Sequence, residues 1–394
     1  MKQYNFDEVI DRTNTSAYKL VLMEKYFGSN DAIPLWVADM DFRTPDFILD
    51  AIKNRCDSGV LGYTLPSADY TTSIAKWLKY KHDWEVSEKF VAFAPGVVTG
   101  LALAIRAFTN PHDKILVQTP VYPPFLSLPN EHNRELVINP LQFHSNTFEI
   151  DFFDFEKKLA SGVRMFILCH PHNPGGRVWN ADELMRMAKL CIQYNVLMVS
   201  DEIHADLMLW GKQHIPLAKL LPEIAQHTIT FMAPSKTFNI PGLASAFFVA
   251  ENPQLFAKMQ QETANFHLNM GNVFGCMATE VAYNEGKEWL NQAIHYIEQN
   301  ILFVRNYIEQ HIPIIQVVVP DASFLVWLDC RKMGLTSKEL KEFMVHKAKV
   351  IMNDGATFGQ GGEGFQRLNV ACPRSVLQQA LQQIETAINE MFTK

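Results

Sequence analysis

Runs of mostly apolar residues without polar alternation recur along the first two thirds of the chain. Each run is four or five residues long and stops at a loop rich in Pro, Gly or polar residues. The runs cover residues 90–93, 114–117, 165–169, 196–199 and 228–232. Such runs are typical of strands buried on both faces, as in a parallel sheet covered by helices.

Helical segments are predicted between these strands. Residues 97–108 follow the first strand after a Pro-Gly turn, and residues 181–194 separate the third strand from the fourth. This alternation predicts βαβ units and an α/β fold with a mostly parallel sheet. Ligands of such sheets collect at the carboxyl ends of the strands, so the loops after the apolar runs are the predicted place for functional residues.

The last third of the chain has a different pattern. Residues 288–311 predict a long helix, and residues 314–319 and 324–328 predict short strands. The last helix is predicted from apolar residues at helical spacing, with Ser375 and Gln378 as a capping box at its start. These elements predict a smaller α+β domain packed on the α/β domain.

We therefore predict three segments. Residues 1–45 form an N-terminal arm and part of the small domain, residues 46–285 form the large domain that binds a cofactor, and residues 286–394 form the C-terminal small domain. The length of 394 residues suits two domains, because single domains usually have about 100–200 residues.

Composition excludes several classes of protein. The hydrophobic fraction of 48% is that of a globular protein, and the net charge of −7 gives no support for binding nucleic acid or a membrane surface. The six cysteines include no C-x-x-C pair, the N-terminus has no apolar signal region, and no apolar run is long enough to span a membrane. We expect a cytoplasmic protein with reduced cysteines.

Four residues whose side chains could bind a cofactor or take part in catalysis follow predicted strands. Lys236 could form a Schiff base if burial lowers its pKa, although a lysine at such a place is more often a solvated surface residue. Asp201 could pair with a protonated pyridine nitrogen, or cap a helix. Asn173 could donate to a phenolate oxygen or only organise its turn. Tyr122 could stack on a planar cofactor, or be an ordinary half-buried tyrosine.

Two further features complete a set. The segment Gly96-Val97-Val98 begins a helix directly after a strand, so its free N–H groups could bind a phosphate. Arg367 lies on a predicted strand of the small domain, where its guanidinium could bind a carboxylate or form a structural ion pair. Together, the amine, carboxylate, amide, aromatic ring and helix end meet the needs of pyridoxal 5′-phosphate (PLP). We predict this cofactor and no metal.

Nine segments resemble the MalY/PatB family of cystathionine β-lyases, a branch of the class I/II aminotransferase superfamily with the fold-type I architecture. They are LWVADMDF (35–42), GYT (62–64), APGVVTG (94–100), TPVYPPF (119–125), PHNPGGRVW (171–179), SDEIHADL (200–207), APSKTFN (233–239), WLDCR (327–331) and FQRLNVACPR (365–374). SDEIHADL and APSKTFN are characteristic of this branch. The match covers nearly the whole chain in the order of the family.

The resemblance implies a role for each candidate. Lys236 would be the catalytic lysine that binds the cofactor, and Arg367 would bind the substrate α-carboxylate, with Trp36 near the substrate end. The remaining cofactor residues would be Asp201 at the ring nitrogen, Asn173 and His204 at the phenolate oxygen, Tyr122 on the ring, Gly96, Val97, Val98 and Ser235 at the phosphate, and Tyr63 reaching the phosphate of a neighbouring subunit. The resemblance therefore also implies a homodimer with shared active sites.

A few positions depart from the family pattern. Pro123 stands where a second tyrosine is common, and Gly175 replaces a larger apolar residue, which predicts a looser turn. His170 replaces an asparagine, and we expect both His170 and His172 to shape their turn by hydrogen bonding. Ala244 stands where typical aminotransferases carry a phosphate-binding arginine.

The implied activity is a carbon–sulfur β-lyase that cleaves L-cystathionine or a related L-cysteine S-conjugate to a thiol, pyruvate and ammonia. The alternative is an aminotransferase acting on an L-amino acid and a 2-oxo acid, because the same cofactor residues serve both reactions. A metal-dependent hydrolase built on His170, His172 and His204 would leave Lys236 and Arg367 without roles. A non-catalytic binding module would not need the full set of cofactor residues.

Overall fold

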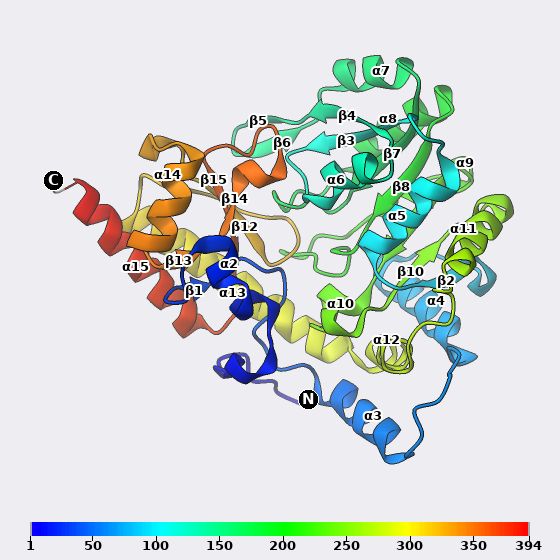
Figure 1. Ribbon diagram of the computed structural model, residues 1–394, viewed down its shortest axis with the longest axis horizontal. Helices are drawn as coiled ribbons and strands as arrows, with labels where there is room; N and C mark the ends of the chain where they lie inside the picture. The colour runs from blue at the N-terminus through cyan, green and yellow to red at the C-terminus, as the bar shows by residue number, and fades with distance from the viewer. Residues whose placement is uncertain (1, 393–394) are drawn as a thin grey trace.

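A seven-stranded sheet forms the centre of the larger part of the molecule in a computed structural model that describes residues 2–392 (Figure 1). Its strand order is β2 (Val91–Ala94), β10 (Ala246–Val249), β9 (Thr228–Met232), β8 (Leu197–Asp201), β7 (Val163–Cys169), β3 (Lys114–Thr119) and β4 (Glu135–Pro140). Strand β10 runs antiparallel to both of its neighbours, whereas the pairs from β9 to β4 are parallel. The predicted mostly parallel sheet is confirmed.

Helices cover both faces of this sheet, which explains why its strands are apolar throughout. In β3, Ile115 and Val117 pack in the core shared with α5, while Leu116 points to the other face and packs in the core shared with α7 and α8. The helices around the sheet are α4 (Asp69–His82), α5 (Val97–Phe108), α6 (Pro124–Glu131), α7 (Phe152–Ala160), α8 (Ala181–Gln193), α9 (Pro222–Ala225), α11 (Pro253–Asn265) and α12 (Val273–Glu285), and α3 (Asp46–Asp57) packs on α12. Because successive residues of a strand face opposite sides, two apolar faces require a continuous apolar run.

A second, antiparallel sheet of four strands lies in the C-terminal part. Its order is β11 (Gln316–Val318), β12 (Leu325–Asp329), β15 (Phe365–Asn369) and β14 (Asn353–Asp354). The long helix α13 (Lys287–His311) and the last helix α15 (Arg374–Phe392) contact each other and share an apolar core with β12. The predicted capping box is wrong, because α15 begins at Arg374 and Ser375 therefore lies inside its first turn.

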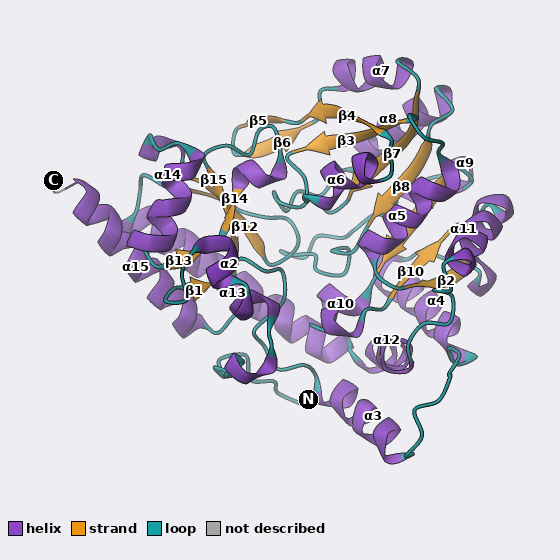
Figure 2. Cartoon of the chain, viewed as in Figure 1, coloured by secondary structure: helices purple, strands orange, loops and turns teal. Residues whose placement is uncertain are grey.

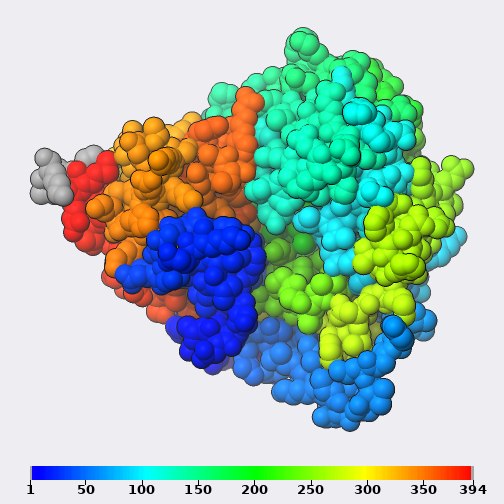
Figure 3. Space-filling model, in the orientation of Figure 1, coloured from blue at the N-terminus to red at the C-terminus, as the bar shows by residue number. Residues whose placement is uncertain are grey.

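The N-terminal segment joins the C-terminal part rather than the large sheet. Strand β1 (Ile33–Pro34) pairs in parallel with β13 (Val350–Ile351), although more than 300 residues separate them in the chain. In the space-filling view this segment, in dark blue, packs on the surface against the orange C-terminal part (Figure 3). No helix among residues 2–392 is both long and apolar enough to cross a membrane.

Loops run between the two sheets (Figure 2). Short helices and strands are α1 (Tyr18–Val21), α2 (Met23–Phe27), α10 (Pro234–Thr237), α14 (Ser337–Glu342), β5 (Gln142–His144) and β6 (Thr147–Glu149). Turns of 3₁₀ helix cover Thr13–Thr15, Glu88–Phe90, Leu217–Lys219, Pro241–Leu243, Arg331–Met333 and Gly355–Phe358, and a π-helical turn covers Phe343–Lys347. Helix α10, directly after β9, carries Lys236 into this region.

Candidate active site

A cavity of about 550 Å³ lies at the carboxyl ends of β7, β8 and β9 and extends to the second sheet. Of the predicted site residues, Trp36, Gly96, Val97, Val98, Tyr122, Asn173, Asp201, His204, Ser235, Lys236 and Arg367 line it. The fold therefore gathers residues that are spread over more than 300 positions of the sequence. Parallel strands explain this, because their carboxyl ends meet at one edge of the sheet.

Lys236 reaches the cavity from α10. Its Nζ donates a hydrogen bond to the carbonyl oxygen of Ala38 at 2.6 Å. Burial, assisted by the positive charge of Arg367, lowers the pKa of Lys236 to about 8, although Asp39 and Asp201 oppose the shift. This lowering makes the unprotonated amine, the form needed for a nucleophile or a general base, far more accessible near neutral pH than it is for an ordinary lysine.

Asp201 ends β8 as a buried carboxylate without a cationic hydrogen-bond partner in the described chain. Its Oδ1 accepts a hydrogen bond from the backbone N–H of Ile203 at 3.0 Å. Burial raises the pKa of Asp201 to about 7, and the nearby Glu202 adds to the shift. A positively charged group placed against this carboxylate would restore its ionised form, so the position suits a protonated ring nitrogen.

Arg367 enters the cavity from β15 and is held by three neutral oxygens. Its Nη1 donates to Oδ1 of Asn173 at 2.9 Å, and its Nη2 donates to the carbonyl oxygen of Trp36 at 3.1 Å and to Oδ1 of Asn353 at 2.6 Å. The guanidinium also lies over the ring of Phe358, 4.9 Å from its centroid. Burial lowers the pKa of Arg367 to about 10, because no anion in the described chain offsets the desolvation of its positive charge.

The cavity is also lined by three uncharged polar residues, His204, Asn173 and Tyr122. His204 is buried, its Nδ1 has no hydrogen-bond partner among the described residues, and burial lowers its pKa to about 3, so the ring is neutral. Asn173 is fixed by its backbone N–H, which donates to the Sγ of Cys169. Burial raises the pKa of the Tyr122 hydroxyl, so this group keeps its proton beside the cavity.

The N-terminal end of helix α5 forms part of the wall of the cavity. Helix α5 begins at Val97, its first turn holds no acidic residue, and its first N–H groups have no carbonyl within the helix to bind. Ser235 lines the cavity together with this turn. A Cβ on Gly100 would lie 2.3 Å from the ring of Phe231, so glycine lets α5 pack closely on β9. An anionic group suits this end of the helix.

Two predicted residues behave differently from the rest. Tyr63 is fully exposed in the loop between α3 and α4 and lines no part of the cavity. Trp36 lines the cavity, but its indole N–H donates to the carbonyl oxygen of Lys19 and its ring packs against Tyr18 and Phe27. Trp36 therefore contacts Arg367 through its backbone oxygen.

The turn after β7 is tight, so the prediction that Gly175 loosens it is wrong. A Cβ on Gly175 would lie 2.6 Å from the ring of Phe148 and 3.0 Å from Nδ1 of His172. The predicted hydrogen bonds of the two histidines are confirmed: Nε2 of His172 lies 2.7 Å from the carbonyl oxygen of Pro120, and Nε2 of His170 lies 3.2 Å from that of Ile215. A larger residue at position 175 requires Phe148 to move.

Two features of the site were not predicted from the sequence. Asn353 contacts Arg367 from a neighbouring strand, and only the register of the sheet places it there. An ionic cluster around the buried Lys19 also holds the segment that carries Trp36 and Ala38: Lys19 lies 3.2 Å from the partly buried Asp39 and 2.9 Å from the partly buried Asp41. The two aspartates in an apolar segment were a signal for this cluster, because buried carboxylates need cations.

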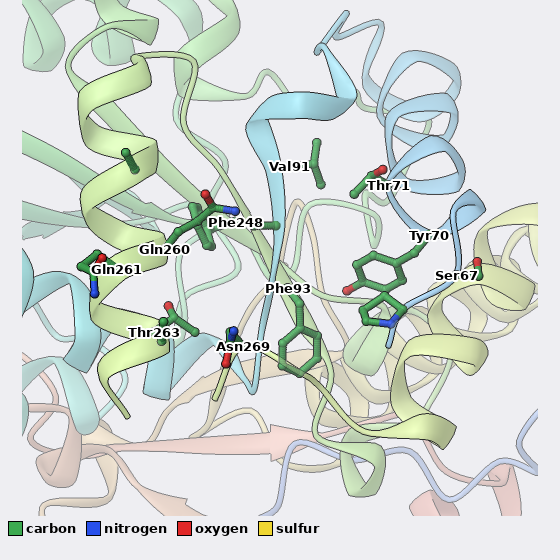
Figure 4. A pocket seen from close by; sticks show the side chains of 14 residues that line it. Ser67, Tyr70, Thr71, Val91, Phe93, Phe248, Gln260, Gln261, Thr263 and Asn269 are labelled. Carbon is green, nitrogen blue, oxygen red and sulfur yellow. The ribbon is translucent and has the colours of Figure 1, made fainter. Parts of the chain in front are cut away.

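Another cavity, of about 530 Å³, lies away from these residues (Figure 4). Tyr70 of α4, Phe93 of β2, Phe248 of β10 and Gln260 of α11 line it, together with other uncharged residues. None of the predicted site residues is part of this cavity. Its lining contains no charged side chain among the described residues.

Comparison with known proteins shows the family to which this chain belongs. The sequence model of the family "Aminotransferase class I and II" matches residues 30–384, so the chain belongs to this family. It is 41% identical to cystathionine beta-lyase PatB of Bacillus subtilis (strain 168) over 386 residues, which cover 98% of this chain and 100% of that protein. The predicted resemblance to the MalY/PatB branch is confirmed.

Solved structures agree with this assignment. A PLP-bound putative aminotransferase from Clostridium difficile 630 has a TM-score of 0.96 at 42% identity, covering 98% of this chain and 100% of that chain. Cystalysin from Treponema denticola, which contains pyridoxal 5′-phosphate, has a TM-score of 0.96 at 34% identity, covering 99% and 100%. The fold-type I architecture is confirmed, and the prediction of PLP as cofactor is supported by both structures.

Proposed function

We propose that this protein is a PLP-dependent carbon–sulfur β-lyase that cleaves L-cystathionine or related L-cysteine S-conjugates to a thiol, pyruvate and ammonia. The observation that supports it most directly is one cavity that contains a lysine with a lowered pKa, a buried unpaired carboxylate and a buried arginine without an anion. Relatives named cystathionine beta-lyase and C-S lyase support the choice of reaction.

The residues of the cavity fit PLP. When bound, PLP withdraws electrons from the α-carbon of an amino acid, which makes its α-proton acidic. Asp201 would keep the proton on the ring nitrogen, and the unpartnered Nδ1 of His204 would lie with Asn173 beside the phenolate oxygen. Tyr122 would pack on the ring. Gly96, Val97, Val98 and Ser235 would bind the phosphate at the start of α5.

Two basic residues of the chain would handle the substrate. Arg367 would bind the α-carboxylate and thereby fix which face of the α-carbon meets the lysine. Nζ of Lys236, as the free amine, would take the proton from the α-carbon. The carbon–sulfur bond at the β-carbon then breaks and the thiolate leaves. The three-carbon product takes up water and ends as pyruvate and ammonia.

A homodimer with shared active sites is part of this proposal. The loop between α3 and α4 exposes four large apolar side chains, namely Val60, Leu61, Tyr63 and Leu65, with exposed fractions between 57% and 101%. Exposed apolar side chains on a single loop are typical of a surface that another chain covers. Tyr63 of one subunit would reach the phosphate site of the other. Sedimentation equilibrium tests the stoichiometry, and a monomer would contradict it.

The domain division and the compartment remain proposals of the same kind. We propose that residues 46–285 form the cofactor-binding domain and residues 286–394 the small domain, with residues 1–45 serving as an arm that joins the latter. The pairing of β1 with β13 supports the last part. We place the protein in the cytoplasm, and its described cysteines, none of which forms a disulfide, are consistent with a reducing compartment.

The experiment that tests the activity is product analysis over a panel of L-cysteine S-conjugates, including L-cystathionine, with and without a 2-oxo acid. A β-lyase releases pyruvate and thiol without the 2-oxo acid, and Lys236→Ala abolishes the release. No pyruvate or thiol from any conjugate would contradict the proposal. Amino-group transfer that depends on the 2-oxo acid would instead establish the aminotransferase alternative, which the family model and the Clostridium difficile structure keep open.

A further inference from the structure

The hydrogen bonds of Arg367 have an unusual feature: none of the oxygens that hold it carries a charge. They belong to the side chains of Asn173 and Asn353 and to the backbone of Trp36. Within residues 2–392, Arg367 forms no ion pair, although its side chain is buried. A buried guanidinium usually has a carboxylate partner, because desolvating a lone charge is costly.

Asn353 owes its place to strand register. Strand β14 pairs antiparallel with β15, and Asn353 stands directly opposite Arg367 in this ladder. Directly opposed residues point to the same face of a sheet, so their side chains meet. The Oδ1 of Asn353 accepts from Nη2 of Arg367 at 2.6 Å, the shortest of the three hydrogen bonds. Asn353 is only partly buried and lines the cavity itself.

Because Asn353 is uncharged, it leaves the positive charge of Arg367 free to attract an anionic ligand. Nη2 uses both of its hydrogens on the chain, whereas Nε has no partner and Nη1 donates to Asn173 in the one hydrogen bond described for it. The side chain is therefore held in position, while its positive charge has no anionic partner in the described chain and Nη1 has one hydrogen left for a ligand. A carboxylate at position 353 would have the same shape as the amide but would neutralise the guanidinium and compete with any incoming anion.

We propose that Asn353 is a positioning residue for substrate binding, which orients Arg367 toward the cavity while leaving its charge for the α-carboxylate of the substrate. The inference rests on the proposed function only in assuming that the ligand is an amino acid held by Arg367. It requires no β-elimination. Asn353 therefore sets affinity for the carboxylate, and the rate of the chemical step depends on other residues.

Paired ligands that differ only in the carboxylate test this role. L-alanine and ethylamine are the same molecule with and without the carboxylate, and the binding of each to the holoenzyme is followed by the absorbance change of the bound cofactor. We expect Asn353→Asp to weaken L-alanine binding about 100-fold and Asn353→Ala about 10-fold. Ethylamine binding should change less than about twofold in both variants, since it makes no use of Arg367.

A matched control is the same Asn→Asp substitution at Asn252, which does not line the cavity. Asn252 caps α11 by accepting from the N–H groups of Gln254 and Leu255, and Asn252→Asp should leave both affinities unchanged. Unchanged L-alanine affinity in Asn353→Asp would overturn the inference, and so would an equal loss for L-alanine and ethylamine, which indicates general damage. L-alanine has no β leaving group, so failure of the lyase proposal would leave this measurement intact.

Discussion

Asp206 lies outside the cavity, and the structure predicts that its replacement strongly destabilises the fold. Its carboxylate is buried and accepts hydrogen bonds from Nε1 of Trp77 at 3.0 Å and from Oγ1 of Thr237 at 2.9 Å, while Nε2 of His82 lies 2.9 Å away. Thr237 directly follows Lys236, so Asp206 also anchors α10. Asp206→Ala would leave this whole cluster without its acceptor.

The size of the effect follows from the groups left unpaired. Each buried donor without an acceptor costs about 1–3 kcal/mol, and the N–H of Trp77 and the hydroxyl of Thr237 both lose their partner. The ring Nε2 of His82, buried 2.9 Å from the same carboxylate, also loses its partner, at a cost of the same order. These contributions overlap, so we predict that Asp206→Ala lowers the free energy of unfolding by about 4 kcal/mol.

The assay is urea unfolding at pH 7 of both proteins under the same saturating PLP concentration, followed by circular dichroism. A matched control is Asp182→Ala, since Asp182 is exposed in the first turn of α8 and should cost no more than about 1 kcal/mol. A loss below about 1 kcal/mol for Asp206→Ala, with an unchanged dependence on urea, would show that the carboxylate of Asp206 does not hold this cluster together.

The pH dependence gives a second check on Asp206. Burial alone would raise its pKa, but the hydrogen bond and charge of His82, with help from Lys81 and Trp77, outweigh burial and lower it. A carboxyl group with a lowered pKa in the folded state contributes stability above its unfolded pKa and loses it as the pH falls through the folded value. The difference between wild type and Asp206→Ala should therefore shrink below about pH 4.

Three other predictions concern the cavity and its walls. In the apoprotein, acylation of Lys236 by an amine-reactive reagent should rise with pH around a midpoint near 8, since burial lowers its pKa to about 8; mass spectrometry reads the labelling, and a midpoint near 10.5 would contradict it. Asp201→Asn should lower kcat at least about 100-fold at saturating PLP, because a neutral amide no longer holds the ring proton, and an active variant would exclude that role. Gly100→Ala should cost about 1–3 kcal/mol of stability in thermal unfolding through overlap with Phe231, whereas Gly242→Ala, which has open space around it, should not.

The sequence pattern predicted the large sheet well, for a physical reason. Strands buried on both faces must be apolar throughout, so residues 114–117 and 228–232 stand out from the chain without any knowledge of their neighbours. The apolar strands also indicated where most of the site lies, since polar residues such as Asp201 and Lys236 stand at or just after their carboxyl ends. A parallel sheet then brings them together at one edge.

Other features depend on distances that no local pattern records. Asn353 meets Arg367 through the register of β14 and β15, and nothing in its own sequence surroundings marks it. Asp206 meets His82 across 124 positions of the chain. The close packing around Gly175 likewise depends on Phe148 from a separate hairpin. These contacts follow from tertiary packing, which the spacing of apolar residues does not encode.

The most direct test of the central claim is the number of pyruvate equivalents released per subunit from an L-cysteine S-conjugate when no 2-oxo acid is present. A β-lyase regenerates its active form after every cycle, so pyruvate and thiol should accumulate in equal amounts to many equivalents per subunit. An aminotransferase would stop after one equivalent of a 2-oxo acid that still carries its sulfur. Continuous pyruvate release is the result that we predict, and arrest after a single equivalent would contradict the account.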